Sequence, residues 1–174
     1  SDVPCYQDRN WGKTFPDWWA WIVSNHFENS PGTTLAIGGG KPHVLGSRTP
    51  LHSVAIGLKH QGKVYDFRPN DLNIIKTDIT FGRWKIVAAD HHHKIVIEAN
   101  APAEKFMDLQ FVTPTGELYH DYETLTGFVN VKLYKDQKLV ADLNSHYAGI
   151  EFGSSKVFNQ ELHQNYHKGQ ELFL

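Results

Sequence analysis

The sequence predicts an all-β protein, an antiparallel barrel or sandwich of about nine or ten strands in a single domain. Short segments rich in β-branched and aromatic residues follow one another closely, and most are separated by residues typical of hairpin turns. Segments with helical periodicity are scarce, so the crossover helices that a parallel sheet needs are missing. The 174 residues suffice for one domain with its own core.

The N-terminal half of the chain contains segments that we expect to pair in hairpins. Residues 18–27 are aromatic and β-branched and lack a polar helical face, which favours a strand over a helix opened by Pro16. Residues 33–37 are the expected hairpin partner, and Gly38-Gly39-Gly40 is expected to end that strand. Two further expected pairs are residues 53–59 with 63–67, across His60-Gln61-Gly62, and residues 72–80 with 83–89, across Phe81-Gly82.

The C-terminal half continues the series of short strands. We expect a strand at residues 94–98 and another at residues 127–134, where apolar and polar side chains alternate sharply. Asp136-Gln137 predicts a turn. The tail, residues 159–169, is polar enough for a short helix, and we expect less than about a tenth of the chain in α-helix. The last two expected strands are residues 139–143 and 147–152.

Charge, cysteine content and hydropathy exclude several classes of protein. The 17 Lys and Arg against 19 Asp and Glu give a formal net charge of −2, which does not suit a strongly basic nucleic-acid or membrane-surface binder. The only cysteine, Cys5, rules out an intrachain disulfide. No apolar run approaches about 18 residues, so we expect no transmembrane helix or secretory segment and a cytoplasmic location. Because the chain begins at Ser1, we expect a processed product or an excised fragment.

Most of the residues that stand out as candidates for a binding or catalytic site are aromatic. Aromatic residues make up 13% of the chain, and four of the five tryptophans (Trp11, Trp18, Trp19 and Trp21) fall within eleven residues. Such rings form either a large core plug or the wall of an apolar cavity, where their faces also stabilise a cationic intermediate. At His91-His92-His93 a solvated turn is favoured over a metal site, because adjacent side chains of a strand point to opposite faces.

One ordered set of motifs resembles a known family. The set begins with Tyr6-Gln7-Asp8-Arg9-Asn10-Trp11-Gly12, which is followed by Phe15-Pro16, the tryptophan-rich residues 18–21 and Asn25. This order resembles the signature of the tocopherol cyclase family. The motifs Ala36-Ile37-Gly38-Gly39-Gly40, Trp84-Lys85, Thr113-Pro114-Thr115 and Thr126-Gly127 follow in the family's order, and residues 145–153 (SHYAGIEFG) resemble its closing element. The resemblance runs from about Tyr6 to Gly153.

The resemblance implies an antiparallel lipocalin-like β-barrel of the calycin type and a redox-neutral reaction. In that reaction an alkene of a prenyl tail is protonated, and a phenol oxygen captures the resulting tertiary cation to close a chromanol ring. No metal or organic cofactor is implied. Family members are longer, so residues 1–174 would resemble the C-terminal half of a two-part protein whose partner is the missing N-terminal half or a homodimer mate. The alternative function, from another class, is a non-catalytic lipocalin-like carrier of a small hydrophobic ligand.

Two carboxyl groups in the matching segments are the candidate proton donors. Asp8 stands just before the Asn-Trp-Gly motif, and Glu151 lies in a strand whose apolar residues face the other way. Burial beside aromatic rings would keep such a carboxyl neutral until an alkene arrives. Glu151 has the alternative of pairing with a cation or backbone N–H groups, and Asp8 that of holding the Trp11 loop. We expect one of the two inside a cavity lined by Tyr6, Trp11, Trp19 and Trp21, with Asn25 or His26 orienting the phenol.

Overall fold

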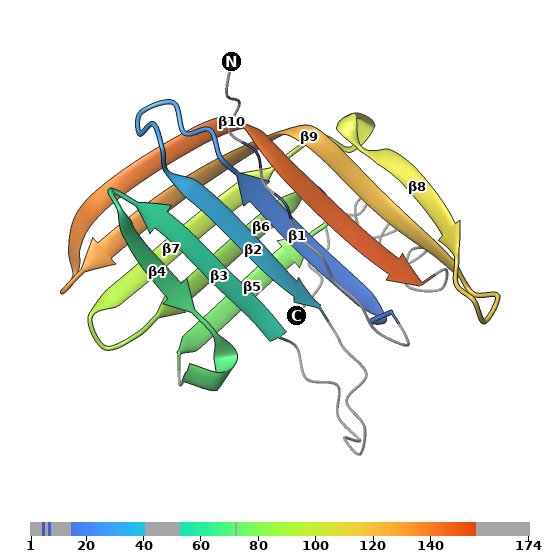
Figure 1. Ribbon diagram of the computed structural model, residues 1–174, viewed down its shortest axis with the longest axis horizontal. Coiled ribbons are helices and arrows are strands. Elements are labelled where there is room, and N and C mark those ends of the chain that lie inside the picture. The colour runs from blue at the N-terminus through green and yellow to red at the C-terminus, as the bar shows by residue number, and fades with distance from the viewer. Residues whose placement is uncertain (1–4, 6, 8–14, 41–52, 72, 156–174) are drawn as a thin grey trace.

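The computed structural model describes residues 5, 7, 15–40, 53–71 and 73–155. These residues form a nearly closed antiparallel barrel without α-helix, so the expected all-β class is confirmed (Figure 1). The strand order is β4-β3-β2-β1-β10-β9-β7-β6-β5, and β8 pairs with the first part of β9. The strands are β1 (Trp18–Ser24), β2 (Thr34–Gly40), β3 (Ser53–His60), β4 (Lys63–Phe67), β5 (Ile74–Thr80), β6 (Arg83–Ala89), β7 (His93–Asn100), β8 (Met107–Val112), β9 (Leu118–Lys135) and β10 (Lys138–Ser155).

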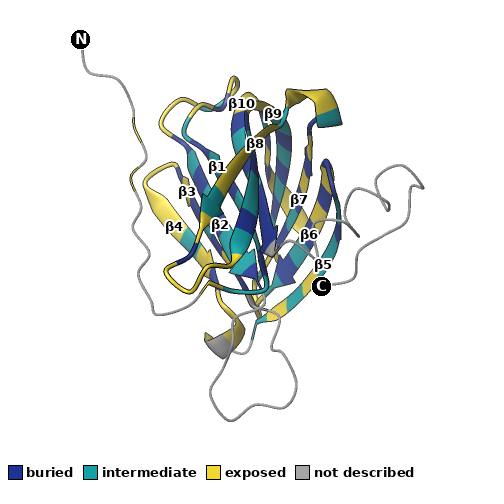
Figure 2. Cartoon of the chain, turned by 90° about the vertical axis from the view of Figure 1, so that its right-hand side faces the viewer, coloured by how far each residue is buried: buried dark blue, intermediate teal, exposed yellow. Residues whose placement is uncertain are grey.

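Alternation of side chains along each strand fills the interior of the barrel. In β1 every second residue is buried, from Trp18 (2% exposed) to Ile22 (0%), and the residues between them are half-buried. The same alternation is visible on other strands, such as β6 and β7, as bands of buried and less buried residues (Figure 2). Because the period of a strand is two residues, one face packs inward and the other faces out. The largest buried side chains include Trp18, Trp84, Phe67, Phe152 and Ile97.

The glycine run belongs to a strand instead of ending one. β2 extends through Gly40, whereas the sequence predicted that Gly38-Gly39-Gly40 would end it. Gly38 lies under the ring of Trp21, where an added Cβ would come within 2.4 Å of the ring. At Gly40 the added Cβ would come within 2.5 Å of the backbone oxygen of Trp18. The strand therefore needs glycine because its neighbour on β1 approaches so closely.

The hairpin of β9 and β10 is longer than the sequence indicated. The expected strands 139–143 and 147–152 are one strand of 18 residues, and the alternating segment 127–134 extends back to Leu118. Irregular pairing between Ser145 and Ala148 changes which residues face inward. The alternation of buried and exposed residues therefore changes phase within the strand, so the sequence of this one strand resembles that of two. The short strand β8 was not expected from the sequence.

The turns agree with the sequence, and their backbone angles explain why. Gln61 and Gly62 have φ angles of 49° and 76°, and Asp136 and Gln137 have 47° and 64°. Positive φ at both central residues is typical of the tight turns that suit the twist of a hairpin. Asp90 closes the turn before β7 by accepting hydrogen bonds from the backbone N–H groups of His92 and His93. No helix in the described residues is long and apolar enough to cross a membrane, and the tail 159–169 lies outside them.

Candidate functional site

Three carboxyl groups meet on the outer face of the barrel wall. Glu151 on β10 is the register partner of Glu123 on β9, and Asp121 lies two residues from Glu123 on the same face. One oxygen from each of these side chains lies within 4.8 Å of the others. We call Asp121, Glu123 and Glu151 the acid cluster. Its members point outward because the residues between them, such as Tyr122 and Phe152, are buried in the core.

A tryptophan fixes the orientation of one member of the acid cluster. The indole Nε1–H of Trp19 on β1 donates a hydrogen bond to the Glu151 carboxyl group. Trp19 reaches it because its ring lies flat over Gly153, where an added Cβ would come within 1.9 Å of ring atoms. A donor aimed at Glu151 favours its ionised form.

Asp121 is the member of the cluster that retains a proton. Burial, followed by the nearby charges of Glu151 and Glu123, raises the pKa of Asp121 to about 8. Burial also raises the pKa of Glu151, but the Trp19 hydrogen bond opposes that shift. The nearby charge of Glu151 opposes the ionisation of Asp121, so the two carboxyl groups titrate as a pair that holds a proton more readily than either would alone. Asp121 Oδ1 is buried and has no donor within the described ranges, which further disfavours the ionised form of this group.

Four aromatic rings stand beside the acid cluster, and we call Phe15, Trp19, Phe111 and Tyr119 the aromatic cluster. Phe111 and Tyr119 are stacked with centroids 5.7 Å apart, and Trp19 stacks on Tyr119 at 5.9 Å. Phe15 lies 4.9 Å from Phe111. The rings come from three strands and from the segment that precedes β1. Aromatic rings beside the acid cluster are the kind of group that stabilises a positive charge developing next to it.

Oxygen ligands of this kind are also the type that hard cations such as Ca²⁺ prefer. A proton held at Asp121 also reduces the repulsion among the three carboxyl groups. Chemically the site suits proton transfer to an apolar substrate, because a neutral acid stands beside rings that stabilise a cation.

The structure separates the sequence-predicted residues into three groups. Glu151, Trp19 and Trp21 are brought together on the outer face of the wall, whereas the interior of the barrel is occupied by core side chains. Trp21 is the register partner of Glu151. Asp8, Tyr6 and Trp11 lie outside the described residues.

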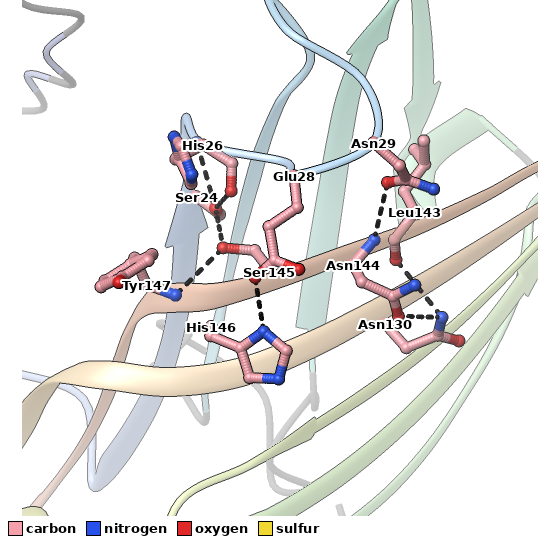
Figure 3. A network of polar contacts seen from close by, with 10 residues as sticks. All are labelled: Ser24, His26, Glu28, Asn29, Asn130, Leu143, Asn144, Ser145, His146 and Tyr147. Atoms are coloured by element: carbon pink, nitrogen blue, oxygen red, sulfur yellow. Dashed lines mark hydrogen bonds and ion pairs between the residues drawn. The ribbon is translucent and has the colours of Figure 1, made fainter.

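Asn25 and His26, expected to orient a phenol, follow the end of β1 at one end of the barrel. The Ser24 hydroxyl group lies 3.2 Å from the backbone oxygen of His26 and 3.0 Å from the Ser145 hydroxyl group (Figure 3). The His26 ring packs edge-on against Tyr147, with centroids 5.5 Å apart. Tyr147 precedes Glu151 by four residues, about 13 Å along a strand, so this polar network is separate from the acid cluster.

Sequence reasoning missed five residues of these two clusters: Phe15, Phe111, Tyr119, Asp121 and Glu123. For the last three the signal is present in the sequence, since Tyr119, Asp121 and Glu123 alternate with His120, Tyr122 and Thr124. Such alternation places the two carboxyl groups on one face of a strand. Only the pairing of β9 with β10 shows that this face continues into Glu151, which is 30 positions further along the chain.

The fold and the site define a class: an antiparallel β-barrel whose outer wall carries close carboxyl groups, one with a strongly raised pKa, beside aromatic rings. Residues 1–154 match the family described as tocopherol cyclase-like. The chain belongs to the tocopherol cyclase-like family.

Two curated relatives give the scale of the similarity. The "Probable tocopherol cyclase, chloroplastic" of Oryza sativa subsp. japonica is 24% identical over 166 residues, and the "Tocopherol cyclase, chloroplastic" of Zea mays is 29% identical over 169 residues. Each match covers 91% of this chain and 35% of the relative, so the chain spans about a third of their length. No solved structure matches this chain. The cytoplasmic location expected from the sequence stays a prediction.

Proposed function

We propose that this chain binds a prenylated phenol or quinol and closes a chromanol ring by protonating an alkene of the prenyl tail. The observation that carries this proposal is the Asp121 carboxyl group, with a pKa of about 8, beside four aromatic rings. Membership of the tocopherol cyclase-like family supports it, as do the names of the two cereal relatives. The chain is about a third of their length, so independent ring closure is part of the proposal.

The reaction needs no oxidant or reductant, because it only rearranges bonds. Neutral Asp121 transfers its proton to the less substituted alkene carbon, which leaves a tertiary cation on the other carbon. The aromatic cluster and the ionised Glu151 lower the energy of this cation. The phenol oxygen then forms a C–O bond to the cation, and its proton returns to the Asp121 carboxylate. The enzyme ends in its starting protonation state, and the product is an isomer of the substrate.

The first test is Asp121→Asn. Asparagine keeps the size of the neutral acid and can donate a hydrogen bond to Glu151, but it has no proton to give to an alkene. We expect ring closure of a prenylated hydroquinone to fall by about 10²-fold or more, measured by chromatography of the chromanol product. Glu98→Gln is the matched control, since Glu98 is an exposed carboxyl that pairs with Lys85 at 3.0 Å on another part of the wall. Equal turnover in the wild type and Asp121→Asn would contradict the assignment of the acid.

Glu151→Gln and Asp8→Asn complete the series. We expect Glu151→Gln to lower turnover, because it removes a nearby charge that helps to keep Asp121 protonated. Asp8→Asn tests the other sequence-predicted acid in the same assay. A large loss in Asp8→Asn together with full turnover in Asp121→Asn would transfer the role of proton donor to Asp8.

The alternative from sequence, a non-catalytic carrier of a small hydrophobic ligand, requires an apolar surface but no proton donor. A carrier would bind the prenylated hydroquinone and release it unchanged, with Asp121→Asn binding as well as the wild type. Binding followed by tryptophan fluorescence, with unreacted ligand recovered from the wild type, would favour the carrier over ring closure.

A further inference from the structure

A shallow groove lies on the outer face of the barrel, over strands β1 to β4. Its main part has a volume of about 440 Å³, and a second part of about 280 Å³ continues it towards Asn25, Lys59 and Cys5. The two parts share Ala36, Gly57 and Val64, so they form one continuous hollow, which we call the outer groove. Its other apolar lining residues are Trp21, Ile37, Gly38, Ala55 and Ile56 in the main part and Leu35 in the second.

Small residues create the floor of the outer groove. Gly38 and Gly57 carry no side chain, and the nearest atom to a Cβ added at Gly57 would be a backbone oxygen 3.9 Å away. The Trp21 ring lies flat over Gly38 and forms one side of the groove, while Val64, 70% exposed, stands on the opposite side. A flat apolar floor between two apolar side chains suits a hydrocarbon better than a polar ligand.

Charged groups line the β3–β4 side of the outer groove, where Asp66 is the register partner of Gly57 and Lys59 that of Val64. Asp66 and Arg68 form an ion pair with each other on the β4 side, and Lys59 lies in the second part. The rest of the lining of the main part is aliphatic or aromatic, whereas the second part also contains Ser24, Asn25 and Thr34. Because Asp66 and Arg68 already pair with each other, a charged ligand would lose hydration over the main part without gaining a free partner there.

The outer groove begins next to the acid cluster. Trp21, which lines it, is the register partner of Glu151, and both residues face out of the wall. Neighbouring strands lie about 4.8 Å apart, so the path from Glu151 on β10 across to β4 is roughly 19 Å. The tail of a substrate whose reacting end lies at Asp121 can therefore extend for several isoprene units over Trp21 and along the floor.

We propose that the outer groove binds the isoprenoid tail of the substrate, beyond the alkene that reacts at the acid cluster. This inference rests on the proposed function, because that function supplies a substrate with a head group and a tail. The head group and first alkene lie at the aromatic cluster, and the rest of the tail crosses Trp21 towards Val64. The groove consequently discriminates between substrates by the length of their tails.

The first experiment uses Cys5 as a reporter, since it is the only cysteine of the chain, is exposed and lines the second part of the groove. The probe is geranylgeraniol, an isoprenoid alcohol that has no phenol and so cannot undergo ring closure. We expect it to slow alkylation of Cys5 by iodoacetamide at least several-fold in a saturable manner. An unchanged alkylation rate over a range of geranylgeraniol concentrations up to its solubility limit would overturn the inference.

The second experiment fills or charges the outer groove by substitution. Gly57→Leu places a side chain over the floor, and Val64→Lys places a charge at its edge. We expect each variant to weaken geranylgeraniol binding about tenfold or more, as measured by tryptophan fluorescence. The matched controls are Ala89→Leu, on the outward face of β6, and Val140→Lys, an exposed position near the β9–β10 turn, and both should bind like the wild type.

The outcomes separate this inference from the proposed function. If Gly57→Leu and Val64→Lys bind the probe like their controls, the groove assignment is wrong whatever the turnover. If they lose the probe while Asp121→Asn keeps it and has lost ring closure, both statements hold. If the wild type binds the probe in the groove but never closes a ring, the groove remains a tail site and the catalytic proposal fails.

Discussion

A single side chain, Asp121, links the site to the stability of the fold. Its pKa is about 8 in the folded chain and near 3.8 when unperturbed, so between these pH values the folded chain holds a proton that the unfolded chain has released. Folding stability must therefore fall as the pH rises from about 4 to about 8 through this group. The cause is burial beside two other carboxyl groups, which makes the charged form costly.

Asp121→Asn should remove this pH dependence. We expect its unfolding midpoint at pH 8 to exceed that of the wild type by about 2–8 °C, from a gain of about 1–2 kcal/mol after allowance for partial solvent screening. At pH 4 the two midpoints should lie much closer together, because the wild-type group is then neutral in the folded state and only partly ionised in the unfolded state. Thermal unfolding at intervals from pH 4 to pH 9 measures the difference, and Glu98→Gln should keep the wild-type slope. Parallel curves for wild type and Asp121→Asn would show that Asp121 titrates normally.

At the scale of the elements, the residues of the tight turns predicted the hairpins. The lengths of the strands could not be predicted, because irregular pairing interrupts the alternation along them. Gln61-Gly62 and Asp136-Gln137 stand out in the sequence because glycine and aspartate are among the few residues that accept positive φ at tight turns. The shift of pairing between Ser145 and Ala148 reverses the alternation, so one long strand resembles two short ones. Glycine is required in β2 because β1 packs closely against it, and no pattern within residues 34–40 indicates this contact.

The turn between β9 and β10 provides a test at this scale. Gln137 adopts a φ of 64°, a conformation that costs a non-glycine residue roughly 1 kcal/mol. Gln137→Gly should therefore stabilise the chain by up to about 1 kcal/mol, measured by urea denaturation. The same substitution in the middle of β8, Gln110→Gly, is the control and should destabilise it, since extended backbone gains nothing from glycine. A loss of stability in Gln137→Gly would indicate that the Gln137 side chain contributes more than its backbone costs.

Over the whole molecule, the residues that stabilise the fold fill the interior of the barrel, whereas the residues of the site lie on its outer face. Hydrophobic alternation predicted that Glu151 faces away from Ala148, Ile150 and Phe152, but it did not decide which face is the interior. The decision needs the closed sheet, because only there do the apolar faces of all strands meet in one core. The acid and aromatic clusters consequently lie on the outer wall, assembled from residues far apart in sequence. That is why Glu151 could be singled out from the sequence and its partner Asp121 could not.

This separation predicts that interior and outer substitutions act on different properties. Ile97 on β7 is fully buried, so Ile97→Ala should lower the free energy of unfolding by about 2–5 kcal/mol through loss of contacts and the cavity left behind. At a temperature where this variant stays folded, its affinity for geranylgeraniol should equal that of the wild type, because the probe binds outside. Val64→Lys should show the reverse pattern, with weakened binding and a nearly unchanged urea midpoint. Leu125→Ala, 71% exposed, controls for loss of a large side chain and should change stability by less than about 0.5 kcal/mol. If the ligand bound inside the barrel, Ile97→Ala would instead change its affinity. That result would place the binding site in the interior.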